Sequence, residues 1–306
     1  MPHNSQKARM QFNFDQLVIV GITTLRDQDL KCLQSISKAQ VAIFSGIEDV
    51  VDPIVSETDC LLVNIQTIVD ASLLKKVTKL RYIGVYGSSL RNIDIEVATR
   101  LGIQVSPVVG YCDTETAEFV IFVAYALARG LLRDDWPEFP YSLHGKTMGI
   151  VGMGKTGTSL CKLARGIGMG VLYYSRTLKP ELEDTYITYS KLEDVVSKSD
   201  IISLHVPPYT QALSAEDFSC MRNSAVLVNT CIGQVFREED LIKWLSLRSN
   251  TAIFDSIAVR AYERVFLQSN VIRVERAAYA TSESIMRLRE KLIQNARNFL
   301  INSFAQ

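Results

Sequence analysis

The sequence has few of the residues that build metal centres and disulfide frameworks. Its six cysteines are spread over 306 residues and contain no C-x-x-C pair. That spacing argues against a structural zinc site and against a set of stabilising disulfides. Histidine occurs only three times, as His3, His144 and His205. We therefore expect no bound metal.

Long apolar runs and an excess of either charge are absent too. The longest apolar run, residues 119–128, is about half the length that spans a bilayer. Lys+Arg and Asp+Glu both total 33, so no net field draws the chain to nucleic acid or to an acidic membrane. The first sixteen residues are polar and do not resemble a signal peptide. We expect a soluble, cytoplasmic protein whose partner is a small molecule.

What the sequence does contain is a regular alternation of short apolar runs with helix-type stretches, which predicts an α/β fold with parallel sheets. The expected strands are residues 17–22, 41–46, 60–65, 80–87, 148–151, 171–175, 200–206, 225–230, 251–256 and 270–274, with a further strand that ends at Val105. A long helix at residues 114–133 is apolar on nearly every face, so we expect it to be buried, most plausibly between two domains. An amphipathic helix is expected at residues 282–304.

One motif points to a ligand. In "MGIVGMGKTGTSL", the glycines Gly152, Gly154 and Gly157 follow an expected strand and open an expected helix. In this context G-x-G-x-x-G predicts dinucleotide binding. The first glycine permits a tight turn, the second allows the backbone to approach a pyrophosphate, and the third lets helix and strand pack closely. The amides at the start of the helix favour the phosphates.

The end of the next expected strand favours NADP(H) over NAD(H). A cofactor with a free ribose 2′-hydroxyl is usually held by an Asp or Glu at this point. Here the residues are Ser175, Arg176 and Thr177. The two hydroxyls can donate to a 2′-phosphate, and the guanidinium can offset its charge.

With these pieces in place, the chain resembles the D-isomer-specific 2-hydroxyacid dehydrogenase family over essentially its full length. The segments that carry the resemblance occur in the family's order, as "LRYIGVYGSSLRNIDIEVATRLGIQVSPVVG", "TETAEFVIFVAYALAR", "LHGKTMGIVGMGKTG", "SDIISLHVPPYTQ" and "MRNSAVLVNTCIGQVFREEDL". The resemblance implies two Rossmann-like domains. A discontinuous, flavodoxin-like substrate domain would comprise residues 1–108 plus 283–306, and an inserted dinucleotide-binding domain residues 109–282. It also implies a homodimer that pairs through the dinucleotide-binding domain.

The family's catalytic residues do not carry over. Its arginine, which binds the substrate carboxylate, falls on Ile232, and its histidine acid/base falls on Arg276. The glutamate that tunes the histidine falls on Arg260. Glu263 is the only acid in that loop and could serve only if the loop took a different path. All three roles are therefore vacant at the family's positions.

The remaining expectations also follow from the resemblance. The substrate turn of the family falls on Gly87, Ser88 and Ser89, where Ser89 adds bulk and a hydroxyl. The residues expected to bind the cofactor are Gly152, Gly154, Lys155, Thr156, Gly157, Ser175, Arg176, Thr177, His205, Val206, Pro207, Thr230, Cys231, Ile232 and Asp255. The candidate catalytic residues are Arg276, Arg260 and Tyr279.

These substitutions leave three hypotheses. The first is an NADPH-dependent reductase whose anion clamp has moved to Arg276 or Arg260. It would act on a protonated imine, which needs no strong acid, or on a carbonyl that takes its proton from Tyr279, Tyr111, Cys231 or water. The second is a catalytically silent NADP-binding relative that acts as a sensor or partner subunit. The third, an ordinary 2-hydroxyacid dehydrogenase with its residues elsewhere, lacks a histidine to support it.

Overall fold

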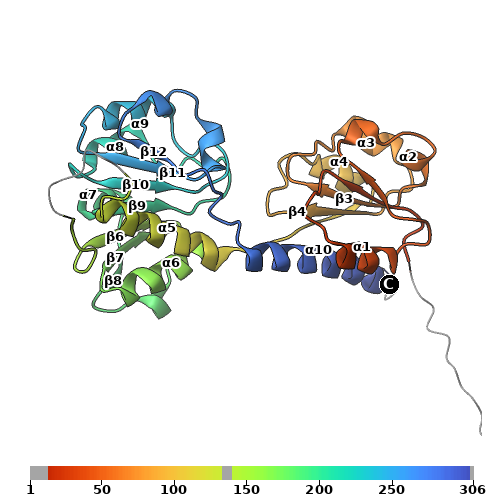
Figure 1. The fold of residues 1–306 in the computed structure, drawn as a ribbon, viewed down its shortest axis with the longest axis horizontal. Helices are drawn as coiled ribbons and strands as arrows, with labels where there is room; N and C mark the ends of the chain where they lie inside the picture. Colours follow the sequence, from red (N-terminus) through yellow and green to blue (C-terminus); the bar gives the residue numbers. More distant parts are fainter. Residues whose placement is uncertain (1–12, 133–139, 304–306) are drawn as a thin grey trace, which may run out of the picture. The chain divides into compact units, whose positions relative to one another are not determined.

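The structure, a computed structural model, describes residues 13–132 and 140–303. The chain divides into two compact units (Figure 1): unit 1 comprises Met1–Tyr111 and Ser282–Gln306, and unit 2 comprises Cys112–Thr281. His3 lies outside the described residues. So do Arg133 and Phe304, the last residues of the two helices expected at 114–133 and 282–304.

Unit 1 is built on a parallel five-stranded sheet of order β2-β1-β3-β4-β5. The strands are β1 (Leu17–Val20), β2 (Ala42–Phe44), β3 (Cys60–Asn64), β4 (Tyr82–Tyr86) and β5 (Gln104–Pro107). Alternate residues of a strand face opposite sides. Tyr82 accordingly packs on Phe299 of the C-terminal helix, while Ile83 and Val85 belong to the core on the other face.

The helices of unit 1 cover both faces of its sheet. They are α1 (Asp27–Gln34), α2 (Ile54–Glu57), α3 (Ala71–Lys76), α4 (Ile95–Arg100) and α10 (Ser282–Asn302), with the short 3₁₀ turn η1 (Ile47–Asp49). α1 and α10 lie side by side on the Tyr82 face, whereas α3 and α4 supply residues to the core on the opposite face.

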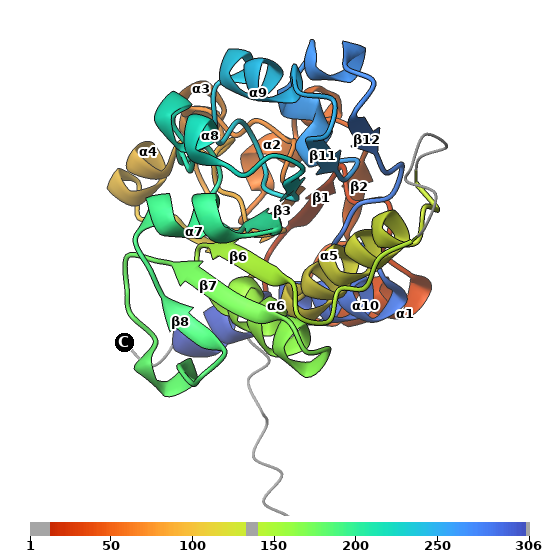
Figure 2. The same cartoon turned by 90° about the vertical axis from the view of Figure 1, so that its left-hand side faces the viewer.

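Unit 2 contains a seven-stranded sheet of order β12-β11-β10-β9-β6-β7-β8, and every strand pair in it is parallel. In Figure 2, β6, β7 and β8 of this sheet lie next to one another. The strands are β6 (Thr147–Val151), β7 (Gly170–Tyr174), β8 (Ile187–Tyr189), β9 (Ile201–Leu204), β10 (Val226–Asn229), β11 (Thr251–Phe254) and β12 (Val271–Arg273). Two parallel sheets with flanking helices confirm the predicted α/β class with two Rossmann-like units.

One face of this sheet carries α5 (Asp113–Ala128) and α6 (Lys155–Gly166), which share a core with β6 and β7. The other face carries α7 (Leu192–Lys198), α8 (Ala215–Cys220) and α9 (Glu238–Leu245). Three 3₁₀ turns complete the unit: η2 (Pro180–Leu182), η3 (Ala258–Ala261) and η4 (Val265–Leu267). No helix in the described ranges is long and apolar enough to cross a bilayer.

The prediction for the long helix was partly wrong. α5 ends at Ala128, because Gly130 adopts φ +72°, the left-handed conformation that commonly closes a helix. It is also not buried all round, since Phe122 is 62% exposed while Val120 and Ala124 on its sheet-facing side are fully buried. A continuous apolar composition hid the exposed face from the sequence pattern. β8 was not predicted; of its three residues only Ile187 is buried.

Candidate functional site

The residues that the sequence assigns to the cofactor and to catalysis in unit 2 all follow strands of one parallel sheet. Gly152–Gly157 follow β6, Ser175–Thr177 follow β7, and His205–Pro207 follow β9. Thr230–Ile232 follow β10, and Asp255 follows β11. Because parallel strands end at the same edge, these segments share the carboxyl edge of the sheet. Ligands of open α/β sheets bind at this edge.

The order of strands reverses between β6 and β9, and this switch point is where the first glycine lies. Gly152 adopts φ +103°, and any Cβ added there would overlap the carbonyl oxygen of His205 at the end of β9. The amide of His205 in turn donates to Val151 O at 2.7 Å. Only glycine allows the two strand ends to approach this closely.

Gly157, the third glycine, lets α6 pack against the turn at Gly152. Gly154, the second glycine, leaves open space in front of the turn. A Cβ at Gly157 would overlap the carbonyl oxygen of Gly152, whereas a Cβ at Gly154 would meet no atom within 4 Å. Gly154 is exposed at the N-cap of the twelve-residue α6, whose first amides are available to an anion. This open cradle in front of a helix N-terminus fits the pyrophosphate of a dinucleotide.

Two residues at the start of α6 complete the turn. Lys155 is exposed, so its ammonium is free to approach a phosphate. The hydroxyl of Thr156 donates to Asp113 Oδ1 at 3.1 Å, which ties the start of α6 to the start of α5. Thr156 therefore has a structural partner, and its contribution to a ligand would come from its backbone amide.

At the end of β7, Ser175 is half-buried, and Arg176 and Thr177 are exposed. None of the ion pairs formed within the described part of the chain involves Arg176. No carboxylate occurs among residues 174–178 to receive a ribose hydroxyl.

His205 lines the opposite side of the switch point as a neutral base. Its Nε2 lies 2.9 Å from Ser203 Oγ, and burial lowers the pKa of His205 to about 4. Val206 is half-buried and Pro207 is exposed. The histidine is therefore uncharged and hydrogen-bonded at physiological pH, and it is not the imidazolium that would act as a general acid.

The loop after β10 carries Thr230, Cys231 and Ile232, three of the predicted cofactor-binding residues. The buried thiol of Cys231 donates to Leu204 O at 3.1 Å, and burial raises the pKa of that thiol to about 12. Ile232 is half-buried, as is Thr230. These properties make Cys231 a packing residue and an inert thiol.

Asp255 anchors both loops that carry the candidate arginines. Its Oδ1 accepts the amides of Ile257 and Ala258 at 3.3 and 2.8 Å, and its Oδ2 accepts the amide of Ala278 at 2.8 Å. The side chain is 2% exposed, and burial raises the pKa of the carboxyl, opposed by these amides and by Arg260. The residue predicted to bind cofactor thus has its carboxylate occupied by backbone donors.

The arginines themselves are free to meet solvent or a ligand. Arg260, in η3, and Arg276, after β12, are both exposed, and the amide of Ser256 donates to Arg276 O at 3.2 Å. Tyr279 is half-buried, and burial raises the pKa of its phenol while Arg260 lowers it. Arg260 therefore interacts electrostatically with both Asp255 and Tyr279.

Sequence reasoning missed the group that holds the η3–η4 loop. Glu238, at the start of α9, is buried and accepts the amides of Glu263, Arg264 and Val265 through Oε1. Burial raises the pKa of its carboxyl, but these amides outweigh it and leave the pKa below its ordinary value. The acidic run at residues 238–240 was the available signal. Glu263 uses its backbone here and exposes its side chain.

A second missed feature is the ring of Tyr209, which lies against Gly233 next to Ile232. Gly233 adopts φ +80°, and a Cβ there would overlap the Tyr209 ring. Tyr209 itself has φ +60°, an uncommon conformation for an aromatic residue. Tyr209 and Gly233 are 24 positions apart in the sequence, so their contact could not be inferred from the sequence.

In unit 1, the predicted substrate turn follows β4. Gly87 is buried with φ +141°, and a Cβ there would overlap Ile65. Its carbonyl accepts the amide of Val108 at 2.9 Å. Ser88 is exposed, and Ser89 Oγ lies 3.5 Å from the amide of Arg91. The backbone path thus requires glycine only at position 87.

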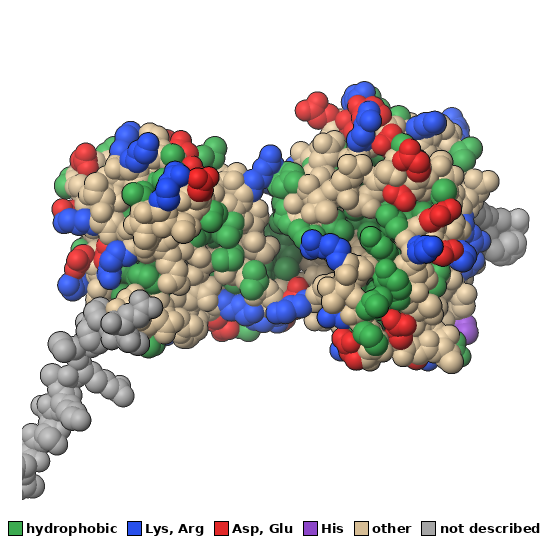
Figure 3. All heavy atoms as spheres, turned by 180° about the vertical axis from the view of Figure 1, so that it is seen from behind, with side chains coloured by type: hydrophobic (Ala, Val, Ile, Leu, Met, Phe, Trp, Pro, Cys, Tyr) green, Lys and Arg blue, Asp and Glu red, His purple; other side chains and the backbone are tan. Residues whose placement is uncertain are grey.

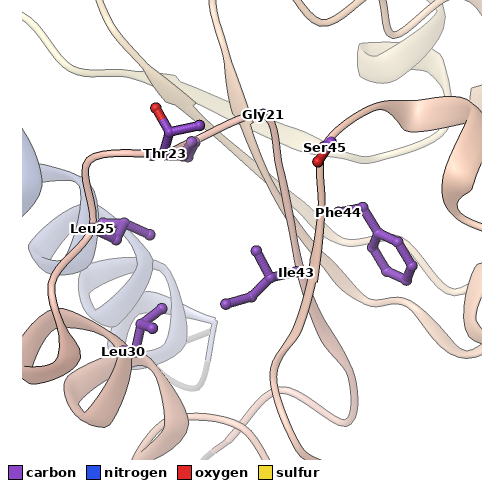
Figure 4. A pocket seen from close by; sticks show the side chains of 8 residues that line it. Gly21, Thr23, Leu25, Leu30, Ile43, Phe44 and Ser45 are labelled. Atoms are coloured by element: carbon purple, nitrogen blue, oxygen red, sulfur yellow. The ribbon is translucent and has the colours of Figure 1, made fainter.

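Unit 1 also has a cavity of about 370 Å³ at the ends of β1 and β2 (Figure 4). In this view, Leu25, Leu30 and Ile43 converge on the open space, while the Phe44 ring points away from it. The lining residues are Gly21, Ile22, Thr23, Leu25, Leu30, Ile43, Phe44 and Ser45. None is charged, so this cavity cannot supply an anion clamp.

Surface charge does not concentrate on the face of the molecule that Figure 3 shows. Basic and acidic side chains are interspersed over it. A mixed surface of this kind provides no continuous basic path for a nucleic acid backbone.

Comparison with known proteins places these features in context. Residues 125–270 match the family described as D-isomer specific 2-hydroxyacid dehydrogenase, NAD binding domain. The chain is 33% identical over 269 residues to a glyoxylate reductase of Thermococcus litoralis, covering 79% of this chain and 80% of that protein. It is 31% identical to a glyoxylate reductase of Aeropyrum pernix, covering 78% and 79%.

Solved structures show the same fold at lower identity. A D-lactate dehydrogenase from Aquifex aeolicus, complexed with NAD and lactic acid, superposes with a TM-score of 0.79 at 20% identity, covering 94% of this chain and 96% of that one. An acyclic imino acid reductase in complex with NADPH and D-Arg gives a TM-score of 0.80 at 22% identity, covering 94% and 97%.

Proposed function

Because the chain belongs to the D-isomer specific 2-hydroxyacid dehydrogenase family, we propose that it is an NADP(H)-dependent reductase of a small carbonyl or imine substrate bearing an anionic group. The observation that carries the proposal is the contrast at one sheet edge. The Gly152–Gly157 cradle fits a dinucleotide, while the family's catalytic positions hold Ile232, Arg260 and Arg276. When bound, the cofactor supplies the hydride.

The preference for NADP(H) rests on the end of β7. Ser175 and Thr177 offer hydroxyl donors, and the exposed Arg176 offers a planar guanidinium that can bind a 2′-phosphate in a bidentate manner. The absence of a carboxylate in the same segment removes the group that would favour a free ribose.

The anion clamp is assigned to Arg276 and Arg260. Both are exposed on loops anchored by Asp255, so either guanidinium can bind a carboxylate without first breaking a buried ion pair. Ile232 contributes an apolar wall where the family has a cation. The Gly87–Ser89 turn of unit 1 has backbone amides that could bind an anionic group of the substrate.

The proton has few possible sources among the described residues. Cys231 is held as an inert thiol, and an arginine is a poor acid because its pKa exceeds about 12. Tyr279 keeps its proton at physiological pH, because burial raises the pKa of its phenol, and it is only half-buried. A protonated imine would need no strong acid, and a carbonyl would take its proton from Tyr279 or water.

The deciding experiment follows oxidation of NADPH and of NADH with glyoxylate, pyruvate, longer 2-oxo acids and cyclic imines. We expect turnover with NADPH and at least one of these compounds, and a KM for it that rises in Arg276→Ala. Tight NADPH binding without oxidation by any compound would support the second hypothesis, a silent NADP-binding relative, and reject this one.

The cofactor preference has its own test. We expect Arg176→Ala to raise the Kd for NADPH at least about tenfold with little effect on NADH, since a charge-assisted hydrogen bond is worth about 1.5–3 kcal/mol. The matched control is Lys198→Ala on α7, an exposed cation 63% accessible in its side chain. Equal losses for both cofactors would argue against a 2′-phosphate site.

We further propose that the protein is a homodimer that pairs through unit 2. Phe122 of α5 is 62% exposed and Leu131, just after it, is 76% exposed, so together they leave apolar surface to cover. Light scattering should give twice the chain mass for the wild type and a lower mass for Phe122→Asp. Ile301→Asp, at a comparably exposed apolar position of unit 1, should keep the wild-type mass.

A further inference from the structure

Tyr86 ends β4 and directly precedes the Gly87–Ser89 turn. Its hydroxyl lies 2.6 Å from Thr24 Oγ1, which is a short hydrogen bond between two neutral hydroxyls. Thr24 lies in the loop between β1 and α1, residues 21–26, and is 62 positions away from Tyr86 in the sequence. The hydrogen bond therefore links that loop to the residue next to the turn.

A buried arginine holds this loop from the side of α10. Arg289 is 4% exposed, and its Nη1 donates to Thr24 O at 3.2 Å. Its Nε lies 3.6 Å from Asp29 Oδ2, and the same oxygen accepts the amide of Arg26 at 2.9 Å. A guanidinium remains charged even when buried, and so it requires this carboxylate. Arg289 therefore holds the middle of the loop through its hydrogen bond to Thr24 O, and the entry into α1 through its ion pair with Asp29.

Packing gives the loop little support on its other side. The cavity in Figure 4 lies there, bounded by Gly21, Thr23 and Leu25 of the loop and by the half-exposed Ile43 of β2. A segment next to an open space of about 370 Å³ has few apolar contacts to fix its path. Its position depends on the polar contacts made by Thr24, Arg26 and Asp29.

We propose that Thr24 and Tyr86 are positioning residues for substrate binding. Their hydrogen bond, held in place by Arg289, orders the Gly87–Ser89 turn so that its amides are aligned for the substrate anion. The inference rests on the proposed function only where it assigns the amides of the turn to the substrate anion. The turn is anchored after Gly87 by the amide of Val108 and before it by the pairing of Tyr86 with Asn64 in the sheet. The Thr24–Tyr86 bond adds a side-chain contact to the anchor on that side.

Two substitutions remove the bond with little change in shape, namely Thr24→Val and Tyr86→Phe. We expect each to raise the KM of the anionic substrate about three- to tenfold, the effect of losing one neutral hydrogen bond, with kcat within about twofold of wild type. The double variant should be no worse than Tyr86→Phe alone, because Thr24→Val then removes no further bond. Thr24→Ser keeps the hydroxyl and should restore the wild-type KM.

The control is Thr23→Val, the preceding threonine, which lines the cavity and has no side-chain hydrogen bond to the described residues. It should retain the wild-type KM. Additive effects of Thr24→Val and Tyr86→Phe, or a KM in Thr24→Val equal to that of Thr23→Val, would overturn the proposal.

A measurement without substrate separates this inference from the proposed function. Hydrogen exchange of the amides of residues 86–91 should be faster in Thr24→Val and Tyr86→Phe than in wild type and Thr23→Val. Unchanged exchange would overturn the positioning role even if the enzyme is active. Absence of turnover in the wild type would reject the proposed function alone, because the exchange comparison still decides whether the bond orders the turn.

Discussion

Two regions of the same sheet edge in unit 2 are built in opposite ways. Around β6 and α6, Gly152 and Gly157 bring backbone so close to backbone that no side chain fits. Around β11 and β12, two buried carboxylates, Asp255 and Glu238, hold the loops through their amides. The side chains of Arg260 and Arg276 on those loops are exposed.

In the first region the same residues set the backbone shape and the proposed binding surface, whereas in the second region different residues do so. In the glycine cradle the proposed binding surface is the backbone itself, so a residue change would alter shape and cofactor binding together. In the arginine loops, the anchors fix the backbone path while residues 260 and 276 make no essential packing contact. Such positions can exchange one catalytic group for another without loss of the fold.

The largest effect should follow from breaking the cradle. Gly152→Ala places a Cβ onto the His205 carbonyl at a φ of +103°, and we expect a loss of more than about 4 kcal/mol in the free energy of unfolding, measured with urea.

Gly154→Ala should keep its stability but bind NADPH at least about tenfold more weakly, because its Cβ fills the open cradle. Gly166→Ala, also free of contacts, should retain NADPH affinity. An unfolded Gly154→Ala would contradict the assignment.

The second largest effect should follow from removing Asp255, the carboxylate that holds the two arginine loops. Asp255→Ala leaves three amides without an acceptor, two of them in buried hydrogen bonds, and we expect about 3 kcal/mol of destabilisation by urea denaturation. Asp255→Asn, which retains one carbonyl oxygen, should lose less. If Asp255→Ala unfolded at the wild-type urea midpoint, the carboxylate could not be the element that holds the two loops.

The neutral histidine at the switch point predicts a pH dependence. Burial lowers the pKa of His205 to about 4, so between about pH 4 and 6.5 the unfolded state binds a proton that the folded state does not. Stability should therefore fall as pH decreases from 6.5 towards 4, by about 2 kcal/mol given the partial exposure of this residue. His205→Gln should show a flatter dependence over that window. An identical pH profile in both proteins would mean that His205 does not titrate in this way.

The smallest effect on stability, and the one that most sharpens the comparison, concerns the exposed arginines. Arg260→Ala and Arg276→Ala should each change the free energy of unfolding by no more than about 0.5 kcal/mol. Substrate KM is expected to rise in the same variants, which thermal unfolding and steady-state kinetics on one preparation would test. A large loss of stability would show that these side chains belong to the scaffold.

The sequence was sufficient for the α/β class and for the family, because both depend on local patterns. Apolar runs marked the strands, and the spacing of Gly152, Gly154 and Gly157 marked the cradle. The same local patterns misjudged α5, where a continuous apolar run concealed the exposed Phe122. Glu238 and Tyr209 could not be assigned, because their partners, Arg264 and Gly233, lie about two dozen residues away and meet them only in the folded unit.

For the candidate site, the sequence by itself determined which side chains are present: three glycines at the switch point, Ile232 in the β10 loop, and arginines at 260 and 276. The tertiary structure decided what surrounds them. It alone placed the His205 carbonyl against Gly152, gave Asp255 amides from two loops, and joined Thr24 to Tyr86 across 62 residues. The physical reason is that burial and hydrogen bonding depend on neighbours in space, which a parallel sheet draws from distant parts of the chain.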